Sequence, residues 1–202
     1  MKDAKSTRTL TWKSAGYAFL LYTSLVLLFT LLGILLAPQG AQIGVTRPEE
    51  TIPGHLAELA AFGVLLGAGS LVVYGRKGLP LVVLIPALTV VLDIDHLPAY
   101  LGYPQTIRPA HSLVFLACAL AATAITIKAL EIDFAVAAGF MGHLAIDTGL
   151  FAPYSPISFQ YVDLGPYRPA FALGAVICAL SAGVVLRRRQ GTRGTGDGSH
   201  NG

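Results

Sequence analysis

The sequence predicts an all-α polytopic membrane protein with about six transmembrane helices. Apolar residues make up 54% of the 202-residue chain and charged residues only 12%, which is about half the charged share of a typical soluble domain. Apolar runs recur along the chain, and several approach the roughly 20 residues that a helix needs to cross a bilayer. Lysine and arginine are concentrated in the segments that six crossings would place on one side, which also predicts an orientation.

Six apolar runs define the predicted helices. The first, residues 17–37, is longer than the apolar part of a secretory signal peptide, and a proline follows it where cleavage would be expected. We therefore expect a retained helix. The third, residues 79–92, would span only about 21 Å as a helix, so we expect that helix to continue through His96. The other runs cover residues 56–74, 111–130, 134–152 and 169–186.

Six crossings place both termini on the same side of the membrane. With that side cytoplasmic, eleven of the 14 lysines and arginines lie inside and three outside, as the positive-inside rule requires. We predict a cytoplasmic segment over residues 1–16, one transmembrane domain over 17–186 and a disordered, basic and glycine-rich tail over 187–202. The expected location is the plasma or inner membrane, with lipids as partners. The chain has no basic stripe with interleaved aromatic residues, so the sequence does not indicate nucleic-acid binding.

Eight ionisable residues interrupt or border the apolar runs. Their centre is the segment Leu-Asp-Ile-Asp-His at 92–96, which ends the third run. An unpaired ionised group in an apolar environment costs several kcal/mol or more, so these side chains need partners. Six helices in the predicted orientation place all eight in the outer half of the membrane. We therefore expect the following residues to meet there: His55, Glu58, Asp93, Asp95, His96, His111, His143 and Asp147.

The residue types and the spacing of two pairs favour a metal centre. His143 and Asp147 are four residues apart and His55 and Glu58 are three apart, so the members of each pair lie near one face of a helix. Imidazole with carboxylate suits Zn²⁺, with Mn²⁺ or Fe²⁺ as alternatives. A centre with an open coordination position activates water, so we expect metal-dependent hydrolysis near the outer face.

Three residues are assigned roles in that reaction. Asp95 or Glu58 would accept a proton from the attacking water. Arg108 would hold an anionic substrate, either lipid-like or a phosphoester, although solvation in a loop is its simpler role. No G-x-S-x-G or His-Glu-x-x-His motif occurs, which argues against a serine hydrolase and against a zincin-type protease.

Other interpretations remain open at this point. Taken singly, His55 could be an interfacial residue, and Asp93 and Asp95 could end a helix in solvent. His143 with Asp147 is harder to explain in this way, because a polar pair in the middle of a span is rare in lipid. Two other functions are a metal-ion or proton transporter, whose polar residues should continue to the inner face, and a non-catalytic protein with a vestigial metal site.

Four short motifs carry a resemblance to a known family. They are Gly-His-Leu at 54–56, Leu-Asp-Ile-Asp-His at 92–96, Ala-His-Ser-Leu at 110–113 and Gly-His-Leu-Ala-Ile-Asp at 142–147. In order and rough spacing they resemble the motifs of the YdjM-like membrane-bound metal-dependent hydrolases, also described as LexA-regulated inner-membrane hydrolases. The similarity covers residues 54–157. It implies a hydrolase with a metal centre built from His55, Asp93, Asp95, His96, His111, His143 and Asp147.

The chain departs from the family pattern at one place. The family usually shows His-Arg-Gly-x-Thr-His-Ser, whereas residues 106–112 of this chain are Thr-Ile-Arg-Pro-Ala-His-Ser. The first histidine and its arginine are therefore absent. This chain would then lack either a ligand of a second metal ion or the cation that anchors the substrate. Arg108 could substitute for that cation.

Overall fold

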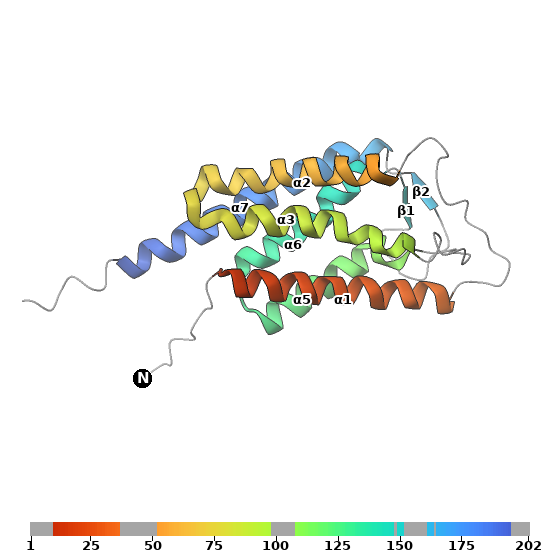
Figure 1. Ribbon diagram of the computed structural model, residues 1–202, viewed down its shortest axis with the longest axis horizontal. Helices are drawn as coiled ribbons and strands as arrows, with labels where there is room; N and C mark the ends of the chain where they lie inside the picture. Colours follow the sequence, from red (N-terminus) through yellow and green to blue (C-terminus); the bar gives the residue numbers. More distant parts are fainter. Residues whose placement is uncertain are drawn as a thin grey trace, which may run out of the picture.

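A computed structural model describes residues 10–36, 52–97, 108–147, 149–151, 161–163 and 165–194. Within these ranges the chain forms a bundle of six α-helices, with a short pair of strands at one end (Figure 1). The elements are α1 (Trp12–Leu36), α2 (Ile52–Tyr74), η1 (Gly75–Gly78), α3 (Leu79–Val91), η2 (Leu92–His96), η3 (Pro109–His111), α5 (Leu113–Thr126), α6 (Leu130–Ile146), β1 (Gly149–Phe151), β2 (Tyr161–Asp163), η4 (Gly165–Tyr167) and α7 (Arg168–Gly194).

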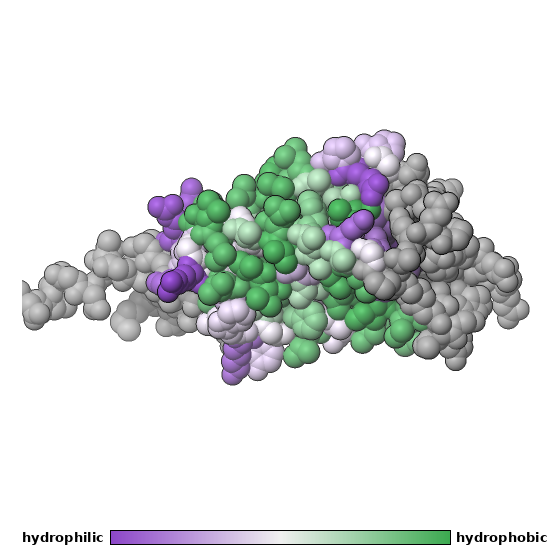
Figure 2. All heavy atoms as spheres, turned by 45° about the horizontal axis from the view of Figure 1, so that its top comes forward, coloured by the Kyte–Doolittle hydropathy of each residue, from purple (hydrophilic) through white to green (hydrophobic). Residues whose placement is uncertain are grey.

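Three helical stretches are long and apolar enough to cross a membrane: Trp12–Leu35, Gly54–His96 and Gly165–Arg189. The second of these is 43 residues long and contains the turn η1, so it comprises the two helices α2 and α3. Large apolar side chains are exposed on the outside of the bundle, and Leu65 and Val72 are 71% and 88% exposed. Figure 2 shows an apolar body with hydrophilic residues toward its two ends. Such an extended apolar surface is typical of contact with lipid.

Helices α2 and α3 form a tight antiparallel hairpin. A Cβ atom added at Gly63 would lie 2.5 Å from Cα of Pro86, and one added at Gly67 would lie 2.8 Å from Cα of Val82. These pairings run in opposite directions along the two helices and converge on η1. Gly75 there has a φ angle of 66°, a left-handed conformation that glycine adopts without steric cost. Small residues therefore let the two backbones approach closely.

Helix α6 lies at the centre of the bundle. Eleven of its 17 residues are buried, and a helix that is apolar around its whole circumference belongs in a core. Close packing continues at Gly139, where an added Cβ would lie 2.6 Å from the Cβ of Leu88 on α3. Because α6 is buried, His143 near its end is held in the interior, with no measurable exposure.

A buried carboxylate joins three helices at the end of the bundle that carries η1 and the start of α6. Glu131 is fully buried, and its Oε1 accepts a hydrogen bond from the backbone N–H of Leu10 at 3.0 Å. Its Oε2 accepts one from Nη1 of Arg189 at 2.8 Å. This residue therefore fixes the chain just before α1 and the last turns of α7 against the beginning of α6.

Two predicted boundaries are wrong. The last helix continues to Gly194, eight residues beyond the predicted end at Leu186, so residues 187–194 are not a disordered tail. Arginine is a good helix former, and the ion pair of Arg189 with Glu131 anchors this extension. Helix α6 ends at Ile146 rather than Ala152, and residues 149–151 pair with 161–163 as antiparallel strands. The predicted termini 1–9 and 195–202 lie outside the described residues.

The predicted all-α class is confirmed, apart from this short pair of strands. The number of membrane crossings and the side on which the termini lie stay predictions. Most of the expected loop over residues 98–109 lies outside the described residues, and its last two positions are Arg108 and Pro109.

We predict that Gly63→Ala destabilises the hairpin by about 1–3 kcal/mol, because the added methyl group overpacks the interface with Pro86. The matched control is Gly16→Ala in α1, where an added Cβ meets nothing within 4 Å. The control should be neutral or stabilising by up to about 1 kcal/mol, owing to the higher helix propensity of alanine. Unfolding of the purified variants in detergent measures both effects. Equal stabilities would contradict the close packing of α2 on α3.

Candidate metal centre

Four segments that are distant in sequence meet at one end of the bundle. His55 lies in the first turn of α2, Asp93 in η2, His111 in η3 and His143 near the end of α6. These positions lie at the end where β1 and β2 are found (Figure 1). Close contacts connect them, including 3.5 Å between Nε2 of His55 and Oδ2 of Asp93 and 3.6 Å between Nε2 of His143 and Oδ1 of Asp93. The structure therefore brings these four of the eight predicted residues together.

The helix of the third run does continue to His96, but its last turn changes to a 3₁₀-helix, η2. Side chains three residues apart eclipse one another in a 3₁₀-helix. Asp93 and His96 therefore lie together, with Oδ1 and Nε2 3.3 Å apart. Asp95 points into the interior, where it has no exposed surface. The change of helix type thus places the carboxylate of Asp93 at the edge of the cluster and that of Asp95 beneath it.

Hydrogen bonds fix the orientation of the two buried imidazoles. Nδ1 of His143 lies 2.7 Å from the backbone oxygen of Thr89, and Nδ1 of His111 lies 2.7 Å from Oδ2 of Asp95. A carbonyl and a carboxylate only accept hydrogen bonds, so both Nδ1 atoms donate. In the neutral imidazole the other nitrogen, Nε2, then carries a lone pair. The two Nε2 atoms face each other at 2.8 Å.

Carboxylate oxygens complete this set of electron-pair donors. Oδ2 of Asp147 lies 3.3 Å from Nε2 of His111 and 3.8 Å from Nε2 of His143. Oδ1 of Asp93 is buried without a hydrogen-bond partner. The three edges between His111, His143 and Asp147 thus bracket the roughly 3.4 Å edge of a tetrahedron with metal–ligand bonds of about 2.1 Å. Buried lone pairs that converge in this way fit a cation.

Two overlapping groups of side chains could hold a metal ion. One consists of Asp93, His96 and His111, and the other of His111, His143 and Asp147. Within each group the ligand atoms lie within 4.8 Å of one another. Because the groups share His111, they are two parts of one centre, which we call the His/Asp cluster.

Arg108 lies inside the His/Asp cluster, so its predicted solvation in a loop is wrong. Its side chain is only 14% exposed. Nε and Nη2 donate to the two oxygens of Asp95 at 3.4 and 3.2 Å, and Nη1 donates to Oδ2 of Asp147 at 3.2 Å. Burial lowers the pKa of the guanidinium, but the neighbouring carboxylates of Asp95, Asp147 and Asp93 outweigh burial and raise that pKa above its ordinary value. Arg108 is therefore a permanent cation of the site.

The other predicted site residues differ in their positions. His55 touches the cluster through Asp93 and through an edge-to-face contact with the ring of His143, and it belongs to neither ligand group. Asp95 has both oxygens engaged by His111 and Arg108, so it orients other groups and is poorly placed to accept a proton from water. Glu58 is exposed, and no contact with the cluster is found for it among the described residues. His55 and Glu58 are three residues apart in α2, and of the two only His55 contacts the cluster among the described residues.

Two residues that support the site were not predicted from the sequence. Thr89 acts through its backbone oxygen, which any residue type would supply, so no sequence signal marks it. Arg168 donates from Nε to the backbone oxygen of Ala145 at 3.1 Å and from Nη2 to that of Ile146. These are among the last carbonyls of α6, which have no partner within the helix. Arg168 therefore stabilises the helix end that positions Asp147, and an arginine at the start of α7 was its only signal.

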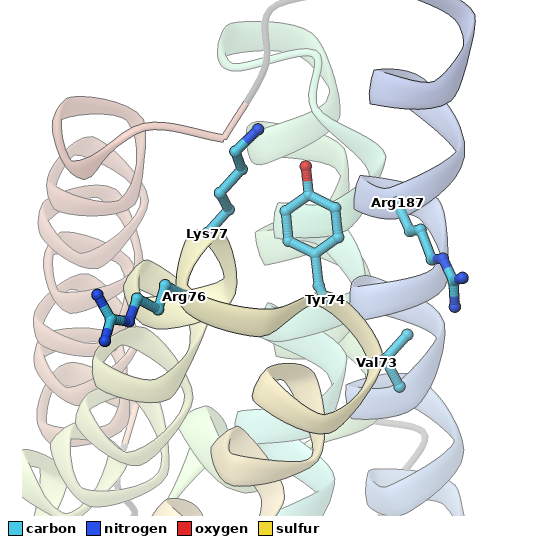
Figure 3. A pocket seen from close by; sticks show the side chains of 5 residues that line it. All are labelled: Val73, Tyr74, Arg76, Lys77 and Arg187. Carbon is cyan, nitrogen blue, oxygen red and sulfur yellow. The ribbon is translucent and has the colours of Figure 1, made fainter.

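A pocket at the other end of the bundle does not resemble a second site for this chemistry. It lies between the turn after α2 and helix α7 and is lined by Val73, Tyr74, Arg76, Lys77 and Arg187. Figure 3 shows its three cationic side chains pointing in different directions, so they do not converge on one anion. The candidate functional site is therefore the His/Asp cluster.

Comparison with protein families, with curated proteins and with solved structures found no match for this chain.

The contact between Asp95 and His111 predicts an effect on metal affinity. We expect Asp95→Asn to weaken metal binding about 10- to 100-fold, because an orienting carboxylate raises the basicity of the imidazole that it holds. Metal affinity is measured by competition with a chromogenic chelator in detergent. Glu58→Gln is the control and should bind metal like the wild type. A loss of affinity in the control alone would contradict the orientation of α2 described above.

Proposed function

We propose that this protein is a membrane-bound metal-dependent hydrolase. The observation that carries the proposal is the pair of buried Nε2 atoms of His111 and His143, 2.8 Å apart, with oxygens of Asp147 and Asp93 beside them. This set of nitrogen and oxygen donors suits Zn²⁺, with Mn²⁺ or Fe²⁺ as alternatives. The motifs that resemble the YdjM-like hydrolases supply four of the segments that meet in the cluster.

The chain's own residues would divide the work as follows. A divalent ion, when bound, supplies Lewis acidity and makes water nucleophilic near neutral pH. His111, His143, Asp147 and Asp93 would hold it. Asp95 keeps His111 in the tautomer that a metal ligand requires, as the backbone oxygen of Thr89 does for His143.

The proton acceptor is better sought at the partly exposed edge of the cluster than at Asp95 or Glu58. His55 belongs to neither ligand group, is 18% exposed and lies 3.5 Å from Asp93. An imidazole is a common general base in enzymes. We therefore assign this role to His55.

The proposed substrate is lipid-like or a phosphoester. Exposed apolar side chains surround the bundle, so an amphiphilic molecule could reach the cluster from the membrane surface. In the proposed topology all six helices cross the membrane with the termini in the cytoplasm, which agrees with the distribution of lysine and arginine. The cluster then opens to the extracytoplasmic side of the plasma or inner membrane.

A transporter is less well supported. A transport pathway needs polar groups along the whole thickness of the membrane. The cluster and the buried Glu131 lie at opposite ends of α6, and residues 134–142 between them include no ionisable side chain. The arrangement is that of a site entered from one end.

Metal analysis tests the proposal directly. We expect the protein, purified in detergent without a polyhistidine tag, to retain near-stoichiometric zinc, manganese or iron, and His143→Ala and Asp93→Ala to lose it. His200→Ala is the matched control, because it removes the one histidine outside the four motifs. Elemental mass spectrometry provides the measurement. Wild-type protein that stays metal-free after loading would rule out the hydrolase mechanism.

Hydrolysis itself forms a second prediction. Chelation should reduce turnover of a phosphoester or phospholipid substrate at least about 100-fold, because the nucleophile depends on the ion, and adding Zn²⁺ should restore it. Release of phosphate or of the lipid product is followed in detergent and in vesicles. Full activity after verified removal of the metal would contradict the proposal.

A further inference from the structure

The charges of the His/Asp cluster limit how many cations it can take. Asp93, Asp95 and Asp147 bring three negative charges, and Arg108 brings one positive charge. Histidines that bind a metal are neutral. The cluster is therefore two positive charges short of neutrality, which is the charge of one divalent ion. A second such ion would leave an excess positive charge in a largely buried place, which desolvation disfavours.

The guanidinium of Arg108 already contacts both ligand groups. Nη2 lies 3.8 Å from Oδ1 of Asp93 and contacts Nε2 of His111, and Nη1 lies 3.2 Å from Oδ2 of Asp147. Its two-pronged hydrogen bonding to the buried Asp95 holds it in this position. A cation without protons to lose thus stands where carboxylates from two segments come together.

The presence of His111 in both ligand groups also indicates that the cluster binds a single ion. Nδ1 of His111 donates to Asp95, so only Nε2 has a lone pair to offer. That lone pair faces Nη2 of Arg108 in this structure, and it would bind at most one ion in place of that contact, although His111 belongs to both ligand groups. The groups are therefore two overlapping descriptions of one coordination site, and they cannot both be complete at the same time.

We propose that the cluster binds one divalent ion and that the guanidinium of Arg108 is a built-in second cation. In this arrangement Arg108 neutralises Asp95 and leaves the cluster with the charge to hold one divalent ion and no second one. This inference rests on the proposed metal centre and specifies its nuclearity. Arg108 is then a positioning residue rather than the anchor of an anionic substrate, since its donors already face carboxylates.

The experiment is a metal-to-protein ratio measured on the full chain. Wild-type protein and the variants Arg108→Met and Arg108→Lys are equilibrated with Zn²⁺ in detergent, freed of unbound metal by gel filtration and measured by elemental mass spectrometry. We expect about one ion per chain for the wild type and for Arg108→Lys, which keeps the charge. We expect about two for Arg108→Met, because the unneutralised carboxylates then attract another cation.

Each outcome decides between the alternatives. Two ions in the wild type, or one ion with unchanged affinity in Arg108→Met, would overturn the role of Arg108 while leaving the metal centre intact. No ion in the wild type would refute the proposed function as well. If Arg108→Met does not fold, the wild-type ratio still decides. A second readout is thermal stability, in which Zn²⁺ should raise the melting temperature of Arg108→Met more than that of the wild type.

Discussion

The need to neutralise carboxylates inside an apolar bundle is the constraint on which the rest of this structure depends. Asp95 is fully buried and Asp93 and Asp147 nearly so, although each ionised group in such a place is costly without partners. An arginine and four histidines from separate segments provide these partners. Helices far apart in sequence are thereby joined at one end of the molecule by electrostatic attraction as well as by packing.

Backbone geometry makes this arrangement specific. The α-helix of α3 tightens into the 3₁₀-helix η2 just where the ionisable residues begin, and this change separates Asp95 from the pair Asp93 and His96. At the C-terminal end of α6, Arg168 donates hydrogen bonds to the last backbone carbonyls of that helix. Small residues bring α2, α3 and α6 close enough for these ends to meet. The cluster thus depends on helix termini, whose free backbone groups must be satisfied in any case.

The two ends of the bundle use buried charge differently. At one end Glu131 has two partners, the N–H of Leu10 and the guanidinium of Arg189, and this satisfied ion pair has a structural role. At the other end Oδ1 of Asp93 is buried without a hydrogen-bond partner among the described residues. Unsatisfied buried acceptors are rare in folded proteins and call for an explanation. The proposed divalent ion would supply the missing partner of Oδ1 of Asp93.

The sequence by itself determined the helical class and the set of histidines and aspartates that meet, because apolar runs and ionised residues within them carry a strong energetic signal. It could not determine which role each of these residues has in the site. The exposure of Glu58, the occupation of both oxygens of Asp95 and the burial of Arg108 depend on helix rotation and on contacts across 13 to 39 residues. Local pattern fixes which groups must find partners, whereas only the tertiary structure decides which partner each one finds.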